Sequence, residues 1–204
     1  MLYNTHNFKI KSFAGQDTAR PELNSVFITA NETIATDGFI LIKVDSVKEF
    51  DIKDYPLIPD KPKALANFQP FMFSKEKIEQ VLKIFPPKVS LPILENVAIF
   101  KRTKNIAEIG STDLGGYQGV MNRIVGGRFP DYKQVINGIK NERCIDVEMN
   151  PQFLKKIADF FCGFSDKKSI KLSVPVKPNK PLMFSGERNK QRAEAYLMPI
   201  KTTE

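Results

Sequence analysis

The clearest periodic pattern in the chain lies in residues 71–85, FMFSKEKIEQVLKIF. FMFS opens it as a short strand would, and Ser74 then stands where a helix N-cap is expected. Beyond Ser74, apolar residues recur at i, i+3, i+4 and i+7: Ile78, Val81, Leu82 and Phe85. This spacing puts one apolar stripe on a helix, which Pro86 and Pro87 would end. The segment predicts a strand followed by an amphipathic helix.

Three strands are predicted after this helix, because apolar or alternating runs are separated there by polar or glycine-containing turns. They are ILENVAIF (93–100), NIAEIGS (105–111) and GYQGVMNRIV (116–125). The pattern therefore indicates the order strand, helix, strand, strand, strand.

The same order is predicted again near the C-terminal end of the sequence. CIDVEM (144–149) alternates like a strand, and Asn150-Pro151 is a typical helix start, with a capping residue followed by proline. The helix that follows has an apolar stripe of Leu154, Ile157, Ala158 and Phe161. Three further strands are predicted in SIKLSVPV (169–176), PLMFSG (181–186) and AEAYLMPI (193–200).

An internal repeat links the first part of the chain to the middle. RPELNSVFI (20–28) and LPILENVAI (91–99) share a proline, a leucine, a valine and an isoleucine at a constant offset of 71. Both copies then reach a Thr-Asp pair, Thr36-Asp37 and Thr112-Asp113. Chance similarity is the alternative for so few identities, but the matched order of features favours a duplicated unit.

These patterns predict three units with boundaries at residues 1–66, 67–140 and 141–204. The first unit is the least defined, because NFKIKSFAG (7–15) fits either a short helix or an alternating strand. The segment GGRFPDYKQVI (126–136) is interpreted as the connector between the second and third units.

Composition agrees with short elements joined by many turns. The 204 residues are 42% hydrophobic, enough to bury a core, and include 14 Pro, 11 Gly and 16 Phe but no Trp. A strand-rich protein is favoured over a helical bundle. The net charge of +8 favours a polyanionic partner such as nucleic acid, although solubility alone would also explain it.

The two cysteines predict neither a disulfide scaffold nor a zinc site. Cys144 and Cys162 are too few and badly spaced for either, so we expect reduced, buried thiols. No apolar stretch has the length of a signal peptide or membrane helix, so we expect a cytoplasmic protein without a membrane partner.

Little in the sequence points to catalysis. His6 is the single histidine, and no phosphate-binding GxxxxGK[ST] motif is present. Asp37, Asp113 and Asp131 could together hold a metal, as in a nucleic-acid enzyme, but each has the turn-like setting in which aspartate usually accepts backbone hydrogen bonds. We therefore expect a protein that is not an enzyme and has no metal or cofactor.

Four segments carry a resemblance to a known family. They are ATDGFIL (35–41), LPILENV followed by STDL (91–97 and 111–114), GGRFPDYKQVI (126–136) and YLMPI (196–200). Together they resemble the bacterial DNA polymerase sliding clamp, a ring-shaped processivity factor. The resemblance implies an α+β fold of repeated βαβββ units, with antiparallel sheets and one helix per unit, and it favours a helix at residues 7–15.

This chain departs from the family in size and charge. The resembled clamps have three domains of two units each, whereas this sequence predicts three units, so it resembles a shortened, divergent member. Such clamps are commonly acidic overall, unlike this basic chain. Their rings contain twelve units, so three units per chain would need a homo-oligomer of four, and an odd unit would lack a partner within its own chain.

The resemblance also implies an apolar groove in which polymerases and repair proteins insert a short linear motif. The matching positions are Thr36, Leu41, Pro130, Val135, Met198, Pro199 and Ile200. Flexible apolar side chains suit a site that accepts several related motifs. The alternative is that these positions are ordinary core and turn residues.

Non-specific contact with duplex DNA is implied through lysines on the helices. Lys155 and Lys156 lie on the polar side of the predicted third helix, and Lys9 and Lys11 flank the first. Contacts of this kind reach phosphates without reading sequence. Much of the positive excess lies instead in predicted turns such as KPK (61–63) and RNKQR (188–192), where it is usually solvated surface.

Three functions are therefore compared. The first is a non-catalytic clamp-like processivity or scaffold protein that contacts duplex DNA and recruits a DNA polymerase or repair protein through the groove. The second is a clamp-derived adaptor that binds peptides without forming a ring. The third is a metal-dependent nucleic-acid enzyme that uses Asp37. The sequence favours them in that order.

Overall fold

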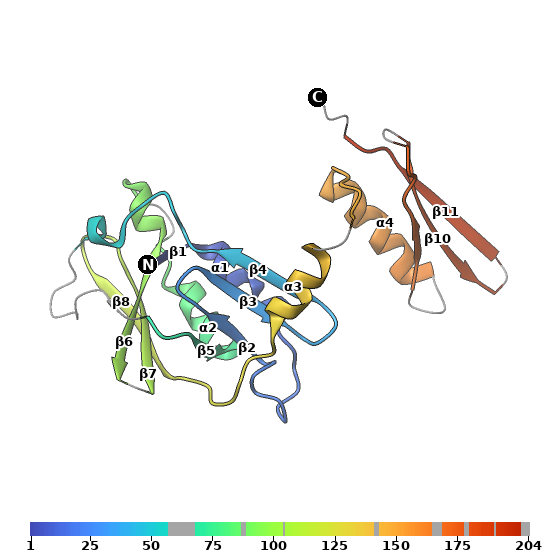
Figure 1. The fold of residues 1–204 in the computed structure, drawn as a ribbon. Coiled ribbons are helices and arrows are strands. Elements are labelled where there is room, and N and C mark those ends of the chain that lie inside the picture. Colours follow the sequence, from blue (N-terminus) through green and yellow to red (C-terminus); the bar gives the residue numbers. More distant parts are fainter. Residues whose placement is uncertain are drawn as a thin grey trace. The chain divides into compact units, whose positions relative to one another are not determined.

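The computed structural model describes residues 1–56, 68–86, 89–103, 105–140, 143–164, 169–177, 180–189 and 191–200 (Figure 1). It contains two compact units, unit 1 at Met1–Gln134 and unit 2 at Val135–Glu204. The elements of unit 1 are β1 (Leu2–Tyr3), α1 (Thr5–Lys9), η1 (Ile10–Phe13), β2 (Ser25–Ile28), β3 (Glu32–Thr36), β4 (Leu41–Asp45), η2 (Ile52–Asp54), β5 (Phe71–Ser74), α2 (Lys75–Lys83), η3 (Pro92–Glu95), β6 (Val97–Thr103), β7 (Ile106–Thr112) and β8 (Tyr117–Arg123). They are followed by α3 (Tyr132–Lys140), and then by α4 (Pro151–Phe164), β9 (Lys171–Ser173), β10 (Leu182–Arg188) and β11 (Gln191–Leu197) of unit 2.

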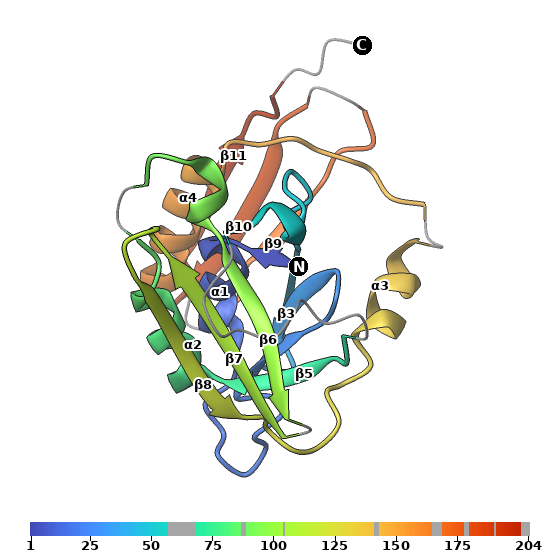
Figure 2. The same cartoon turned by 90° about the vertical axis from the view of Figure 1, so that its left-hand side faces the viewer.

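Unit 1 consists of two βαβββ repeats that exchange their first strands. Its two four-stranded sheets have the orders β1-β6-β7-β8 and β4-β3-β2-β5, so each first strand joins the sheet of the other repeat. Strands β6, β7 and β8 of the first sheet lie side by side in Figure 2. β1 pairs with β6 through Leu2 opposite Ala98, and β5 pairs with β2 through Met72 opposite Phe27. Repeat 1 (β1 to β4) and repeat 2 (β5 to β8) therefore complete each other, and the α+β prediction is confirmed.

The Thr-Asp turns confirm the duplication in detail. The threonine hydroxyl donates to the carbonyl oxygen four residues later, at 2.6 Å from Thr36 and 2.7 Å from Thr112. The aspartate Oδ1 accepts backbone N–H groups two and three residues later, at 2.8 and 2.9 Å for Asp37 and at 3.0 and 2.8 Å for Asp113. The two turns have the same hydrogen bonds at matched places in their repeats, which favours duplication over chance similarity.

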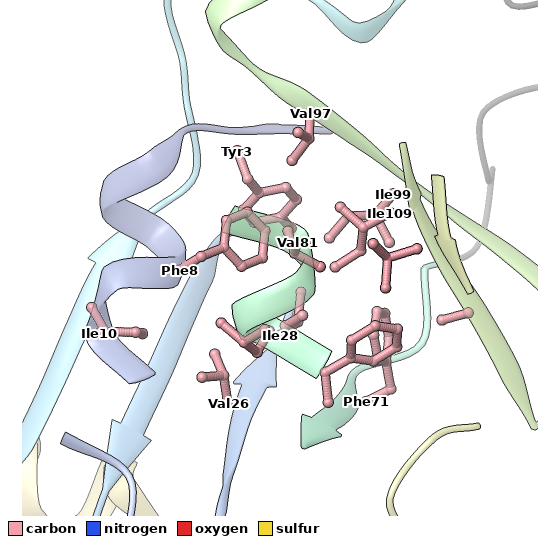
Figure 3. Close-up of a cluster of buried hydrophobic side chains, with 14 of the residues drawn as sticks. Tyr3, Phe8, Ile10, Val26, Ile28, Phe71, Val81, Val97, Ile99 and Ile109 are labelled. Atoms are coloured by element: carbon pink, nitrogen blue, oxygen red, sulfur yellow. The ribbon is translucent and has the colours of Figure 1, made fainter. Parts of the chain in front are cut away.

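One core joins the two repeats of unit 1. Side chains from both sheets point toward those of α1 and α2 (Figure 3). The repeated positions supply its centre, since Val26 and Ile28 on β2 and Val97 on β6 are fully buried. Burying each such side chain contributes about 1.5–3 kcal/mol, so each repeat is stabilised by the other.

Residues 5–13 are helical, as the resemblance implied. Asn4 caps α1 by accepting the His6 N–H at 3.0 Å, and its own N–H donates to Asn7 Oδ1 at 3.1 Å. The buried Asn7 amide then donates to Thr33 Oγ1 and to the backbone oxygens of β4. These bonds hold the helix against β3 and β4, which explains why the segment does not continue as a strand.

Unit 2 packs α4 on a three-stranded sheet of order β11-β10-β9. Asn150 caps α4 by accepting the Gln152 N–H at 2.9 Å, as predicted. The predicted stripe faces the sheet, with Phe161 buried among Leu182, Phe184 and Leu197. One helix and three strands of the predicted third unit are therefore present.

Two predictions are wrong in this part of the chain, and a third is confirmed only over a shorter range. Residues 144–149 form no strand, because the described sheet of unit 2 gives them no neighbour with which to form a ladder. The strand predicted at 169–176 is limited to β9. Cys144 and Cys162 are exposed rather than buried, Cys162 because it lies on the side of α4 away from the sheet.

The connector also differs from its prediction in form. Gly127 adopts φ +98°, which suits a glycine turn, but Tyr132–Lys140 continues as the helix α3. None of the helices in the described ranges has the length and apolar character needed to cross a lipid bilayer.

Candidate functional site

The FPDY part of the connector lies on the outer face of the β2 sheet. The Phe129 ring stacks on the ring of Phe27, with centroids 4.8 Å apart and planes 10° apart. Tyr132 meets both rings edge-on at 6.3 Å. Phe129 and Tyr132 are buried, so these two aromatic side chains anchor the connector.

A chain of charged groups fixes the same anchor to β3 and β4. The Tyr132 hydroxyl donates to Glu32 Oε1 at 2.6 Å, and Lys43 Nζ donates to Glu32 Oε2 at 2.9 Å and to Asp45 Oδ1 at 2.7 Å. Burial and the neighbouring carboxylate raise the pKa of Tyr132 to about 12. Burial alone would raise the pKa of Glu32, but the hydrogen bonds from Tyr132 and Lys43 outweigh it and lower that pKa.

A cavity of about 500 Å³ lies beside this anchor. Pro130 lines it together with Phe27, Phe129 and Tyr132, while Glu32, Asp131, Arg128 and Lys133 give it charged walls. Of the predicted groove residues, Pro130 is the one in this cavity. The aromatic neighbours were missed by sequence reasoning, because Phe27 and Phe129 are about a hundred residues apart and no local pattern links them.

The ATDG turn presents a second apolar surface on unit 1. Thr36 and Leu41 face each other across the β3–β4 pair, but the Thr36 hydroxyl is occupied within the turn. Between them Phe39 is 96% exposed and Ile40 is 48% exposed. We did not single out these two residues from the sequence, although FI within ATDGFIL was a visible signal.

The remaining groove positions belong to unit 2. Pro199 and Ile200 line a cavity of about 250 Å³, whose apolar wall also includes Val147, Val174 and Leu182. Val135 on α3 and Met198 after β11 are exposed. The predicted positions therefore form two sets, Thr36, Leu41 and Pro130 in unit 1 and Val135, Met198, Pro199 and Ile200 in unit 2.

The helices of unit 1 carry a mixed but net positive face. α1 and α2 lie together, with the rings of Phe8 and Phe85 5.9 Å apart. The lysines of α1, α2 and the adjoining η1 are Lys9, Lys11, Lys75, Lys77 and Lys83, and the glutamates are Glu76 and Glu79. Lys11 is 2.5 Å from Glu79, and this ion pair lowers the pKa of Glu79. Lys9 is exposed. Of the two DNA contacts predicted on this face, Lys9 can therefore reach a phosphate more readily than Lys11, which is paired with Glu79.

Helix α4 of unit 2 carries the other predicted DNA contacts. Lys155 and Lys156 are exposed, and Lys156 Nζ lies 5.8 Å from the centre of the Phe153 ring. Phe153 and Phe160 are themselves about half exposed on this helix. The outer surface of α4 is therefore both basic and aromatic.

Two of the three aspartates considered for a metal, Asp37 and Asp113, have structural roles in the turns, whereas Asp131 lines the cavity beside Pro130. Oδ1 of Asp37 accepts two backbone N–H groups, and these bonds lower its pKa. Asp113 makes the matching bonds in repeat 2. Across the part of the chain that the structure describes, no group of three or more His, Cys, Asp or Glu side chains is placed to hold a metal ion.

Sequence comparison identifies no relative, since neither a family model nor a curated protein matches the chain. Structural comparison does find similar proteins. The DNA polymerase sliding clamp of Pseudomonas aeruginosa has a TM-score of 0.64 and 20% identity, covering 98% of this chain and 50% of its own. DNA polymerase III subunit beta of Borrelia burgdorferi has a TM-score of 0.65 and 14% identity, covering 97% of this chain and 48% of its own. The Helicobacter pylori beta clamp has a TM-score of 0.64 and 14% identity, covering 100% of this chain and 52% of its own.

These similarities extend over 97–100% of the chain and establish the fold. The chain has the sliding-clamp fold and spans about half the length of the solved clamps it matches. The resemblance seen in the sequence is confirmed at the level of fold.

Proposed function

We propose that this protein is a non-catalytic, clamp-like scaffold of DNA replication or repair that acts in the cytoplasm. It contacts duplex DNA without sequence specificity and recruits a DNA polymerase or repair protein through apolar surfaces. The observation that carries the proposal is the sliding-clamp fold, which extends over nearly the whole chain. The net charge of +8 supports a polyanionic partner.

The peptide site is proposed on the surfaces where the predicted groove residues lie. On unit 1 these are the exposed apolar tip at Phe39 and Ile40, next to Leu41, and the cavity beside Pro130. On unit 2 they are Met198, Pro199 and Ile200, with Val135 on α3. A linear motif with apolar anchor residues would bury such side chains without needing a charged partner.

Peptide binding is tested with the double variant Leu41→Ala/Met198→Ala and a fluorescent peptide that carries a clamp-binding motif. We expect affinity to fall at least tenfold, because two apolar contacts are truncated. Met121→Ala, which removes a similarly exposed methionine on β8, is the matched control and should bind like the parent. Equal affinity of the double variant and the parent would remove these positions from the proposal.

The DNA contact is proposed at Lys9, Lys155 and Lys156, which are exposed, with Lys11 contributing less because Glu79 neutralises it. Anisotropy of two duplexes of unrelated sequence should give equal affinities that weaken with salt. Lys155→Ala/Lys156→Ala should lower the slope of log affinity against log salt by about 2, because two phosphate contacts are lost. Lys48→Ala/Lys53→Ala is the control, since it removes two lysines that lie outside α1, α2 and α4. Absence of binding at low salt would reject the DNA contact.

A peptide-binding adaptor without DNA affinity is the second candidate. The ion pair between Lys11 and Glu79 favours it, because it reduces the positive charge of the face formed by α1 and α2. Peptide binding without any measurable duplex binding would identify this candidate.

A further inference from the structure

Unit 2 repeats the βαβββ plan of repeats 1 and 2, and three matched backbone hydrogen bonds demonstrate the equivalence. In each repeat, a residue of the first-strand segment accepts the N–H of a residue just beyond the fourth strand. The pairs are Leu2 with Val47 at 3.0 Å, Met72 with Val125 at 3.0 Å and Glu148 with Ile200 at 2.9 Å. The helix-capping residue follows two positions later in every repeat, at Asn4, Ser74 and Asn150. Residues 144–149 thus occupy the first-strand position of repeat 3 (residues 144–200).

The first-strand segments of repeats 1 and 2 use their other edge to pair with a different repeat. β1 pairs with β6 and β5 pairs with β2, so each second strand has neighbours on both sides. In unit 2 the corresponding second strand is β9, and the described sheet ends at it. Segment 144–149 forms no strand there. Among the described residues of unit 2, no strand ladder joins segment 144–149 to the open edge of β9.

The apolar surface around β9 shows what this open edge leaves uncovered. Leu172 lies opposite Phe184, which is buried in the core of unit 2, so Leu172 points to the core side of the sheet. Yet Leu172 is 49% exposed, and its neighbours on the same side, Ile170 and Val174, are 40% and 41% exposed. The matching residues of β2, Val26 and Ile28, are both 0% exposed.

Helix α4 shows the same difference. In unit 1, α1 and α2 cover each other, and the ring of Phe8 is completely buried against Phe85. In unit 2, Phe153 and Phe160 are one stripe of α4, seven residues apart, and are 51% and 55% exposed. The open face of repeat 3 thus combines an unpaired strand edge with apolar side chains from both β9 and α4, which is typical of an interaction surface.

We propose that this open face is completed by the same face of a second copy of the chain. Residues 144–149 of each copy pair with β9 of the other, and the two α4 helices pack side by side. A repeat of this plan already pairs with another of its kind in unit 1 through two reciprocal strand exchanges. That arrangement is isologous, so two identical repeats form it as readily as two similar ones.

This interface assigns a second copy of the chain as the partner of unit 2, which goes beyond the function proposed above. It rests on the repeats and the exposed apolar residues, and it does not require DNA or peptide binding. A chain that dimerises but binds neither ligand would contradict only the proposed function. A monomer that binds both ligands would contradict only this inference.

Light scattering of the full chain at micromolar concentration tests the interface. We expect the parent to contain an even number of copies of the 23.2 kDa chain and Ile170→Glu/Leu172→Glu to contain half that number, because charges then replace apolar side chains at the open face. Lys171→Glu changes the same strand on its opposite face and should keep the mass of the parent. A monomeric parent, or a folded double variant with the parent's mass, would overturn the proposal.

A disulfide experiment tests the same interface if Ile170→Glu/Leu172→Glu fails to fold. In a Cys144→Ser/Cys162→Ser background, Glu148→Cys and Ser173→Cys are introduced together. Equivalence with Leu2 opposite Ala98 brings these positions within reach across the interface, so oxidation should give a covalent species of twice the chain mass. Glu148→Cys alone should remain at the mass of one chain under the same conditions. An oxidised double-cysteine chain that also stays at that mass would contradict the exchange of strands.

Discussion

Strands β2 and β9 hold the same position in their repeats but differ in what surrounds them. β2 lies between β3 and β5, and its inward side chains are fully buried. β9 pairs with β10, and its core-side residues are nearly half exposed. The core-side residues are aliphatic in both strands, Val26 and Ile28 in β2 and Leu172 in β9, so we attribute their different burial to the neighbouring repeat, which pairs with β2 through β5.

The largest expected difference concerns the residue that directly precedes the helix-capping residue, Phe73 before Ser74 in repeat 2 and Met149 before Asn150 in repeat 3. Phe73→Ala removes a fully buried ring from unit 1 and should lower the free energy of unfolding by about 3–5 kcal/mol. Met149→Ala at the matching place in repeat 3 should cost about half of this or less, because Met149 is only partly buried. Urea unfolding of the two variants at low protein concentration measures both effects. Equal losses would contradict the distinction between repeats 1 and 2, which complete each other, and repeat 3, whose face is open.

Concentration should affect the two units differently. If unit 2 is completed by a second copy, association stabilises it by mass action, and its melting temperature should rise with protein concentration. Each tenfold increase of concentration corresponds to about 1.4 kcal/mol per dimer. Unit 1 contains its own completed pair, so its transition should shift much less. Calorimetry over a hundredfold range of concentration measures the difference, and a unit 2 transition that does not move would count against the comparison.

Tyr132 anchors the connector to unit 1. Tyr132→Phe removes the hydrogen bond to Glu32 and should destabilise unit 1 by about 1–2 kcal/mol. The pKa of Tyr132 is raised above its ordinary value of 10.0, so the folded state favours the protonated phenol. Its contribution is complete below pH 10 and is lost as pH rises toward 12. The parent should therefore lose stability in this window more steeply than the variant, whereas parallel curves would contradict the role of the anchor.

The smallest expected effect lies in the turns shared by repeats 1 and 2. Gly38 and Leu114 occupy the same turn position, with φ of +95° and +75°. A leucine in this region is strained, so Leu114→Gly should stabilise unit 1 by up to about 1 kcal/mol. Gly38→Ala should destabilise it by a similar amount. Thermal unfolding of both variants tests the equivalence, and changes of the same sign would contradict it.

The elements of the fold that depend on local pattern could be predicted from the sequence. The stripe from Ile78 to Phe85 and the Asn150 cap identified α2 and α4, and the repeated Thr-Asp pairs identified the duplication. The alternation in CIDVEM indicates that this segment can pair as a strand, but it does not show whether a partner strand is present. This is why a strand was predicted where the structure has none.

The candidate site depended more on distant contacts and was less predictable. Pro130 was identified through its motif, but its neighbours Phe27 and Glu32 reach the connector from about a hundred residues away. The neutralisation of Lys11 by Glu79 likewise joins two helices that no sequence pattern connects. Charge and hydrophobicity indicate which residues are suited to a surface, whereas packing decides which of them are available.

Hydrogen exchange at β9 tests the difference between closed and open repeats most directly. At high protein concentration, the amides of Lys171–Ser173 that point away from β10 should be protected, because residues 144–149 of a second copy cover that edge of the strand. On dilution their protection should fall, while the amides of β2 and β6 stay protected by their partners in unit 1. Protection of β9 that is the same at both concentrations would contradict the account.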